Sequence, residues 1–176
     1  LIEMAGKQMG IVGMGQIGSA VAHIALALGM TVMAYTSKPQ ELMPEGVTAT
    51  SDLDQVFATS DVVSLHCPLT PTNKGMVDAR RLALMKPTAM LINTARGLLI
   101  DEQALAQALN DGVIMAAALD VMIDEPPAHD NPLLTARNCF FTPHVGWATH
   151  EARERMMRVI IDNVVAWVQG KPENVV

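Results

Sequence analysis

The fold is decided by one stretch near the start of the chain, Met9-Gly10-Ile11-Val12-Gly13-Met14-Gly15-Gln16-Ile17-Gly18. Its first four residues form an apolar run that predicts a strand, and the helical periodicity of 16–28 follows at once. A G-x-G-x-x-G spacing between a strand and a helix is typical of a turn that binds a dinucleotide. We expect Gly13 to permit the tight turn, Gly15 to let the backbone approach the pyrophosphate, and Gly18 to let the helix pack on the strand.

The beginning of the predicted helix is the expected phosphate contact. Backbone amides near Gln16 and Ile17 have no carbonyl partner within the first helical turn, and they lie at the positive end of the helix dipole. A glycine turn with a purely structural role is the alternative, because glycine-rich turns are common. The context of strand, turn and helix favours the phosphate site.

The same alternation continues through the rest of the chain. Further strands are predicted at Thr31–Tyr35, Asp61–Leu65, Ala89–Ile92, Ile114–Leu119 and Cys139–Thr142. Further helices are predicted at Glu102–Asn110, at Thr149–Gln169 and in a short segment that begins with an N-cap sequence at 51–54 and ends at about Thr59. Strands that are apolar on both faces and alternate with helices indicate a parallel sheet. The predicted fold is therefore α/β: a Rossmann-like, doubly wound parallel sheet of about seven strands with helices on both faces.

Composition and charge exclude several classes of protein. The apolar runs are only about five to eight residues long, whereas roughly 20 are needed to cross a membrane. The formal net charge of −6 argues against a nucleic-acid-binding protein. The arginines at 153, 155 and 158 alternate with glutamates, so we interpret them as a solvated helix face rather than a phosphate patch. Cys67 and Cys139 are the only cysteines, which favours a reduced, cytoplasmic protein.

The residues after the second predicted strand bear on which dinucleotide binds. An acidic residue at this position bonds the ribose 2′-hydroxyl of NAD and repels the 2′-phosphate of NADP. Here the sequence has Thr36, Ser37 and Lys38, so a carboxylate is lacking and a cation is near. The sequence therefore admits NAD or NADP. Lys38 as an ordinary solvated loop residue is the alternative.

Three chemically active side chains follow strands in the second half of the chain. Arg96 follows a buried strand, and a guanidinium can hold a carboxylate through two parallel hydrogen bonds. His144 follows the last strand and can exchange a proton with a substrate oxygen. Glu125 is the candidate carboxylate that orients the imidazole and raises its pKa. We predict Arg96, Glu125 and His144 as catalytic residues for hydride transfer to or from a small 2-hydroxy or 2-keto acid.

The chain closely resembles the NAD-binding domain of the D-isomer-specific 2-hydroxyacid dehydrogenases. The resemblance is carried by the glycine motif together with 66–71 (His-Cys-Pro-Leu-Thr-Pro), 93–97 (Asn-Thr-Ala-Arg-Gly), 118–126 and 142–144 (Thr-Pro-His). The stretch 144–149, mainly through Trp147, is most similar to the glycerate dehydrogenase or hydroxypyruvate reductase branch. Thr36 departs from the acidic residue that is usual in the family.

The resemblance implies roles for further residues. It places Thr94 and Asp120 at the nicotinamide and Cys67 and Thr72 on the phosphate side. The full set of predicted cofactor contacts comprises Gly13, Gly15, Gln16, Ile17, Gly18, Thr36, Ser37, Lys38, His66, Cys67, Pro68, Thr72, Thr94, Ala95, Arg96, Asp120, His144 and Gly146. No metal ligands are expected. A catalytic Cys67 thiol would need an activating partner that the sequence does not identify, so we expect Cys67 only to line the wall of the binding site.

We expect residues 1–176 to form one dinucleotide-binding domain of a larger enzyme. Nearly every residue is used by the predicted sheet and its helices, whereas hydride transfer generally needs a reacting carbon shielded from water. The resemblance also implies a homodimer. Two other functions stay open on the same fold: a formate or phosphite dehydrogenase, and a regulatory or scaffolding protein that senses the nicotinamide cofactor.

Overall fold

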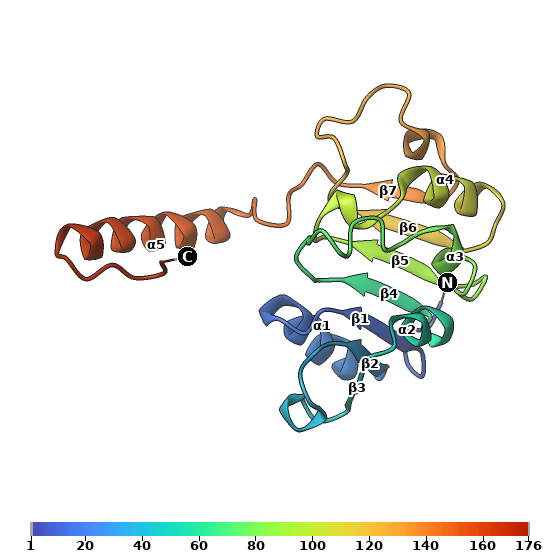
Figure 1. Ribbon diagram of the computed structural model, residues 1–176, viewed down its shortest axis with the longest axis horizontal. Helices are drawn as coiled ribbons and strands as arrows, with labels where there is room; N and C mark the ends of the chain where they lie inside the picture. The colour runs from blue at the N-terminus through green and yellow to red at the C-terminus, as the bar shows by residue number, and fades with distance from the viewer. Residues whose placement is uncertain (1, 176) are drawn as a thin grey trace. The chain divides into compact units, whose positions relative to one another are not determined.

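Figure 1 shows a computed structural model of the chain, which describes residues 2–175. The chain divides into two compact units between Pro143 and His144. The first unit contains the sheet, and the second contains one long helix.

The first unit is built on a seven-stranded sheet. Its strands are β1 (Gln8–Val12), β2 (Thr31–Tyr35), β3 (Val47–Thr50), β4 (Val62–Leu65), β5 (Met90–Asn93), β6 (Ala116–Leu119) and β7 (Cys139–Phe141). All pairs are parallel, in the order β3-β2-β1-β4-β5-β6-β7. The predicted doubly wound α/β fold is confirmed. The strand order reverses between β1 and β4, and such a switch point opens a crevice at the carboxyl ends of the strands.

The helices are α1 (Gln16–Ala27), α2 (Leu53–Thr59), α3 (Ala79–Leu82), α4 (Glu102–Asn110) and α5 (His150–Val168), with short 3₁₀ turns η1 (Gln40–Leu42), η2 (Gly97–Leu99) and η3 (Pro132–Thr135). Their ends follow local chemistry. The carboxylate of Asp52 accepts the N–H of Gln55 at the start of α2, and that of Asp101 accepts the N–H of Ala104 at the start of α4. Gly29 follows α1 with a positive φ of 77°, which glycine adopts without strain.

The strands bury both of their faces, because alternate side chains enter two different cores. Ile11 and Val62 lie in the core beneath α1, whereas Val12 and Val63 lie in the larger core beneath α2, α3 and α4. The sheet therefore has helices on both faces. Over β6 and β7 the α1 face is less covered, since Ala118 is exposed and its partner Phe140 is 64% exposed.

The last helix lies close to its predicted bounds. A helix is predicted at Thr149–Gln169, and α5 spans His150–Val168 with Thr149 and Gln169 as its capping residues. However, α5 belongs to the second unit and contains no buried residue. Its apolar side chains, among them Ile161, Val164 and Trp167, are about half exposed or more. The helix is therefore amphipathic, but its apolar side is not packed into a core.

A separate finding concerns membranes. Among residues 2–175, no helix combines the length and the apolar character that crossing a bilayer requires.

Candidate dinucleotide site

The glycine turn after β1 is packed directly against the end of β4. Gly13 has a φ of 101°, and a Cβ there would lie 2.8 Å from the backbone nitrogen of Cys67. The Gly13 N–H donates to Tyr35 O (3.0 Å), and the His66 N–H donates to Val12 O (2.8 Å). Only glycine fits this combination of positive φ and close backbone approach. The turn thereby holds the ends of β1, β2 and β4 together.

The other two motif glycines have different surroundings. A Cβ on Gly18 would lie 2.0 Å from Gly13 O, so this glycine is needed for α1 to approach the turn. A Cβ on Gly15 would meet no protein atom within 4 Å, although Gly15 lines a cleft beside the turn. The fold therefore does not use the space above Gly15, and that space is available to a ligand.

The first turn of α1 faces this space with its amides uncapped. Gly15 is the N-cap residue, no side-chain hydrogen bond caps the helix, and its first turn has no acidic residue. Gln16 and Ile17 are exposed there. A helix start of this kind attracts phosphate through its N–H groups and its dipole.

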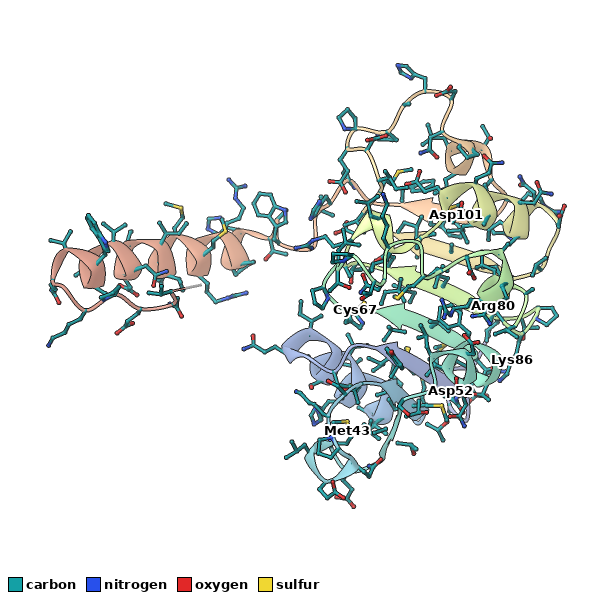
Figure 2. All side chains as sticks on the ribbon, viewed as in Figure 1. Met43, Asp52, Cys67, Arg80, Lys86 and Asp101 are labelled. Carbon is teal, nitrogen blue, oxygen red and sulfur yellow. The ribbon has the colours of Figure 1, made fainter. Side chains whose placement is uncertain are left out.

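A cleft of about 490 Å³ opens beside the turn, at the carboxyl ends of β1, β2 and β4. Its lining residues are Gly13, Met14, Gly15, Tyr35, Thr36, Ser37, Lys38, Ser51, His66, Cys67 and Pro68. The cleft thus lies at the switch point that the strand order creates, where doubly wound sheets bind their ligands. Figure 2 shows Cys67 just beyond the tip of β4.

His66 and Cys67 form an uncharged wall of the cleft. Burial lowers the pKa of His66, so its imidazole is neutral near pH 7, and its Nε2 lies 2.9 Å from Ser64 Oγ. Burial also raises the pKa of the Cys67 thiol, although its backbone hydrogen bond opposes this. A half-buried, protonated thiol is a poor nucleophile. The structure therefore favours the interpretation of Cys67 as a wall residue.

Arg96 lies at the carboxyl end of β5, in a turn that a buried asparagine organises. Asn93 is fully buried; its Oδ1 accepts the N–H of Ala95 (3.0 Å), and its Nδ2 donates to Arg96 O (2.9 Å). The exposed Arg96 guanidinium donates to Ala95 O (2.6 Å). A Cβ on Gly97 would lie 2.0 Å from the backbone carbon of Met122. The turn after β5 is therefore pressed against the loop after β6.

The loop after β6 carries Glu125. Asp120, mostly buried, accepts a hydrogen bond from Thr142 Oγ1, and its N–H donates to Asn93 O (2.9 Å), so β5, β6 and β7 are linked at this edge. Further along, Glu125 is exposed, and its Oε1 accepts the Met122 N–H (3.1 Å). Asp120 and Glu125 therefore lie on the side of the sheet where Arg96 lies.

A glutamate on α4 anchors the same loop. Glu102 accepts the N–H of Ile123 (2.7 Å) and the side-chain amide of Asn131 (2.6 Å). The anchoring role of Glu102 is not predictable from the sequence, because it depends on contacts with residues that follow it by more than 20 positions. Its only sequence signal is an acidic residue in the first turn of a helix, which is common for electrostatic reasons alone.

The predicted site residues fall into four groups. Eight of them line the cleft: Gly13, Gly15, Thr36, Ser37, Lys38, His66, Cys67 and Pro68. Gln16, Ile17 and Gly18 lie in the first turn of α1 and are not part of the cleft lining. Thr94, Ala95, Arg96, Asp120 and Glu125 lie after β5 and β6, outside its lining, and Thr72 is exposed after β4. His144 and Gly146 are exposed in the second unit, where His144 has a φ of 52°. The pairing of His144 with Glu125 therefore stays a prediction.

Three cleft residues were not predicted: Met14, Tyr35 and Ser51. Met14 and Tyr35 could have been inferred, since one lies inside the glycine motif and the other ends a predicted strand. Ser51 follows β3, which sequence analysis missed. Within residues 2–175, no group of three or more potential metal-binding side chains was found.

The chain is similar to known proteins over its whole length. It is 46% identical to a hydroxypyruvate reductase of Blautia hydrogenotrophica and 47% identical to a glycerate dehydrogenase of Methylorubrum extorquens, covering 100% of this chain and 55% and 54% of those proteins. Among solved structures, an acyclic imino acid reductase in complex with NADPH and D-Arg has 38% identity and a TM-score of 0.89, covering 99% of this chain and 55% of that one. The chain thus spans about half the length of the curated relatives it matches.

The family comparison agrees with the geometry. The profile of the D-isomer specific 2-hydroxyacid dehydrogenase NAD-binding domain matches residues 1–146, which include the glycine turn and all of the sheet. With its cleft at the switch point and its strand order, this chain belongs to the family of D-isomer specific 2-hydroxyacid dehydrogenase NAD-binding domains.

Proposed function

We propose that the chain is the cofactor-binding part of an oxidoreductase that transfers hydride between a nicotinamide dinucleotide and a D-2-hydroxy acid or its 2-keto acid. Substrates of the glycerate, hydroxypyruvate or glyoxylate type fit best, because the relatives named above act on hydroxypyruvate and glycerate. The observation that carries the proposal is the cleft of about 490 Å³ at the switch point, built around the glycine turn.

The cleft fits a dinucleotide in three respects. The space above Gly15 is not used by the fold, the first turn of α1 presents uncapped amides, and the residues that line the cleft include no carboxylate that would repel phosphate. When bound, the cofactor supplies or accepts the hydride. The glycine turn and α1 hold its pyrophosphate through backbone N–H groups.

Arg96 is the proposed substrate anchor. It is exposed at the carboxyl end of β5, and the Asn93 side chain fixes the backbone from which it projects. A guanidinium there can bind a substrate carboxylate in bidentate fashion and polarise the neighbouring keto group. Because β5 lies two strands from β1, this position is on the nicotinamide side of a dinucleotide laid across the switch point.

His144 is the proposed proton donor and acceptor, with Glu125 as the carboxylate that orients it. Reduction of a ketone requires a proton on oxygen as hydride reaches carbon, and imidazole titrates in the useful range. Glu125 is held in place by the Met122 N–H, within a loop that Glu102 anchors. Residues 1–176 are proposed to act as one cofactor-binding domain of the larger enzyme.

We further propose a cytoplasmic homodimer. Cys67 and Cys139 are both free thiols, and burial raises the pKa of Cys139 to about 11, with Glu102 adding to the shift. Free, unreactive thiols suit a reducing compartment. The dimer rests on family resemblance, and light scattering of the purified protein would test it.

Turnover by the complete enzyme tests the proposal. Wild-type enzyme should reduce hydroxypyruvate or glyoxylate, and His144→Ala should lower kcat by roughly 10²–10⁴-fold while cofactor binding persists. His129→Ala is the matched control, since this exposed histidine lies in the loop 128–131 and has no proposed role. Unchanged turnover in His144→Ala would contradict the assigned role. Tight cofactor binding without turnover on any of these acids would instead favour a regulatory protein.

A further inference from the structure

The wall of the cleft at the end of β2 carries no negative charge. Thr36, Ser37 and Lys38 line it there, together with Ser51 from the end of β3, and none of the lining residues is Asp or Glu. In doubly wound dinucleotide sites this wall faces the adenosine ribose, because an acidic residue here bonds the ribose 2′-hydroxyl. In this chain hydroxyl groups and one ammonium occupy that wall.

The acidic residue next to Ser51 in the sequence does not replace the missing carboxylate. Asp52 follows Ser51, but its side chain caps α2 by accepting the Gln55 N–H at 3.1 Å. The carboxylate is thereby committed to the start of a helix, and Asp52 is not among the residues that line the cleft.

Lys38 is exposed, but a hydrogen bond holds its ammonium at the wall of the cleft. Its Nζ donates to Met14 O, a carbonyl of the glycine turn, at 2.7 Å, and its backbone N–H donates to Thr36 Oγ1 at 3.1 Å. An ammonium has three N–H donors, so two remain for a ligand. The Thr36 hydroxyl hydrogen is likewise available as a donor, because its oxygen acts as the acceptor in this turn. The cation is thus already positioned, which lowers the entropic cost of using it in binding.

We propose that Thr36, Ser37 and Lys38 form a subsite for the 2′-phosphate of NADP(H), so that this chain binds NADP(H) in preference to NAD(H). A phosphomonoester carries up to two negative charges near pH 7 and three acceptor oxygens, which match one ammonium and two hydroxyl donors. The inference rests on the proposed function in one respect: the cleft must hold the adenosine half of a nicotinamide dinucleotide.

The test separates the phosphate subsite from the rest of the cofactor. Calorimetric titration of the 176-residue chain with adenosine 2′,5′-bisphosphate and with 5′-AMP compares two ligands that differ only in the 2′-phosphate. Charge-assisted hydrogen bonds of this kind make the bisphosphate bind roughly tenfold or more tightly than 5′-AMP. NADPH and NADH, titrated in parallel, should differ in the same direction.

Two variants assign the effect to the proposed residues. Lys38→Gln keeps an amide donor for Met14 O but removes the charge, so affinity for the bisphosphate and NADPH falls while that for 5′-AMP and NADH does not. Thr36→Asp places a carboxylate at the end of β2, and the preference reverses toward NADH. Lys171→Gln is the control: it makes the same charge change at an exposed residue beyond α5.

The outcomes distinguish a failure of the 2′-phosphate subsite from a failure of the dinucleotide cleft. Tighter binding of the 2′-phosphorylated ligands that Lys38→Gln abolishes and Lys171→Gln leaves intact supports the subsite. If 5′-AMP and NADH bind as tightly as their phosphorylated counterparts, the subsite is wrong and the dinucleotide cleft still stands. If none of the four ligands binds, the cleft assignment fails and the subsite fails with it.

Discussion

The same substitution at two glycines of one motif should change two different properties: stability at Gly18 and cofactor affinity at Gly15. In Gly18→Ala the new methyl group would lie 2.0 Å from Gly13 O, 3.1 Å from the Gly13 carbonyl carbon and 3.3 Å from Ile11 Cγ2. A Cβ atom essentially never lies within 3.0 Å of another heavy atom in a protein, so α1 and the turn must separate by about 1 Å or more. Both nearest atoms are backbone, and no side-chain rotation relieves the contact.

The magnitude follows from two opposing effects. Overpacking of this kind costs about 1–3 kcal/mol, and a clash with backbone lies at the upper end of that range. Alanine in a helix recovers up to about 1 kcal/mol relative to glycine. We therefore expect Gly18→Ala to lower the free energy of unfolding by about 2 kcal/mol, which corresponds to a fall in Tm of roughly 4–8 °C for a chain of this size.

Gly15→Ala is the matched control for stability. Gly15 has a φ of −79°, which alanine adopts readily, and its Cβ would meet no protein atom. The Tm should change little, but the methyl group enters the space assigned to the pyrophosphate, so NADPH affinity should fall. Calorimetric melting and NADPH titration measure both properties on the same samples. A Tm of Gly18→Ala equal to that of wild type would refute the packing argument, and unchanged NADPH affinity in Gly15→Ala would refute the position of the phosphates.

Two further predictions concern stability and the loop after β6. Burial raises the pKa of Asp61, but the hydrogen bond from the Gln8 N–H and the Lys86 ammonium together lower it by more, so the net shift of the pKa is downward. The ionised Asp61 therefore stabilises the fold above its ordinary pKa of 3.8, and this contribution is lost as the pH falls through the lower pKa of the folded state. In Asp61→Asn the free energy of unfolding, measured by urea unfolding, should therefore fall less steeply as the pH is lowered. In Glu102→Ala the Ile123 amide loses its carboxylate acceptor and should exchange its hydrogen at least about tenfold faster, whereas an unchanged exchange rate would show that Glu102 does not anchor the loop.

Six of the seven strands are predictable from the sequence, and there is a clear physical reason why the seventh is not. Strand β3, Val47–Thr50, has two threonines in four residues and only Val47 buried, so it lacks an apolar run. It exists because its backbone pairs with β2, as in the register of Val32 with Val47. Pairing of this kind is a tertiary contact that local patterns do not encode. Missing β3 also meant missing Ser51, which lies beyond its end.

The structural roles of Gly13 and Gly18 are predictable from the sequence because each follows from backbone geometry alone. The positive φ of Gly13 and the contact of Gly18 with the turn are as expected from the motif. The environment of α5 was not predictable in this way. Its periodicity correctly predicts a helix, but periodicity does not say which surface covers the apolar side, and the helix has no buried residue.

The most direct test of the central claim is the map of amide chemical shifts in this chain as NADPH is added. We expect saturable changes at the glycine turn 13–18, at 36–38 after β2 and at 66–67 after β4, because these segments line one cleft or face it. Changes confined to the separate cleft around Lys74 and Gln103, or no saturable change at all, would contradict the assignment of the dinucleotide site.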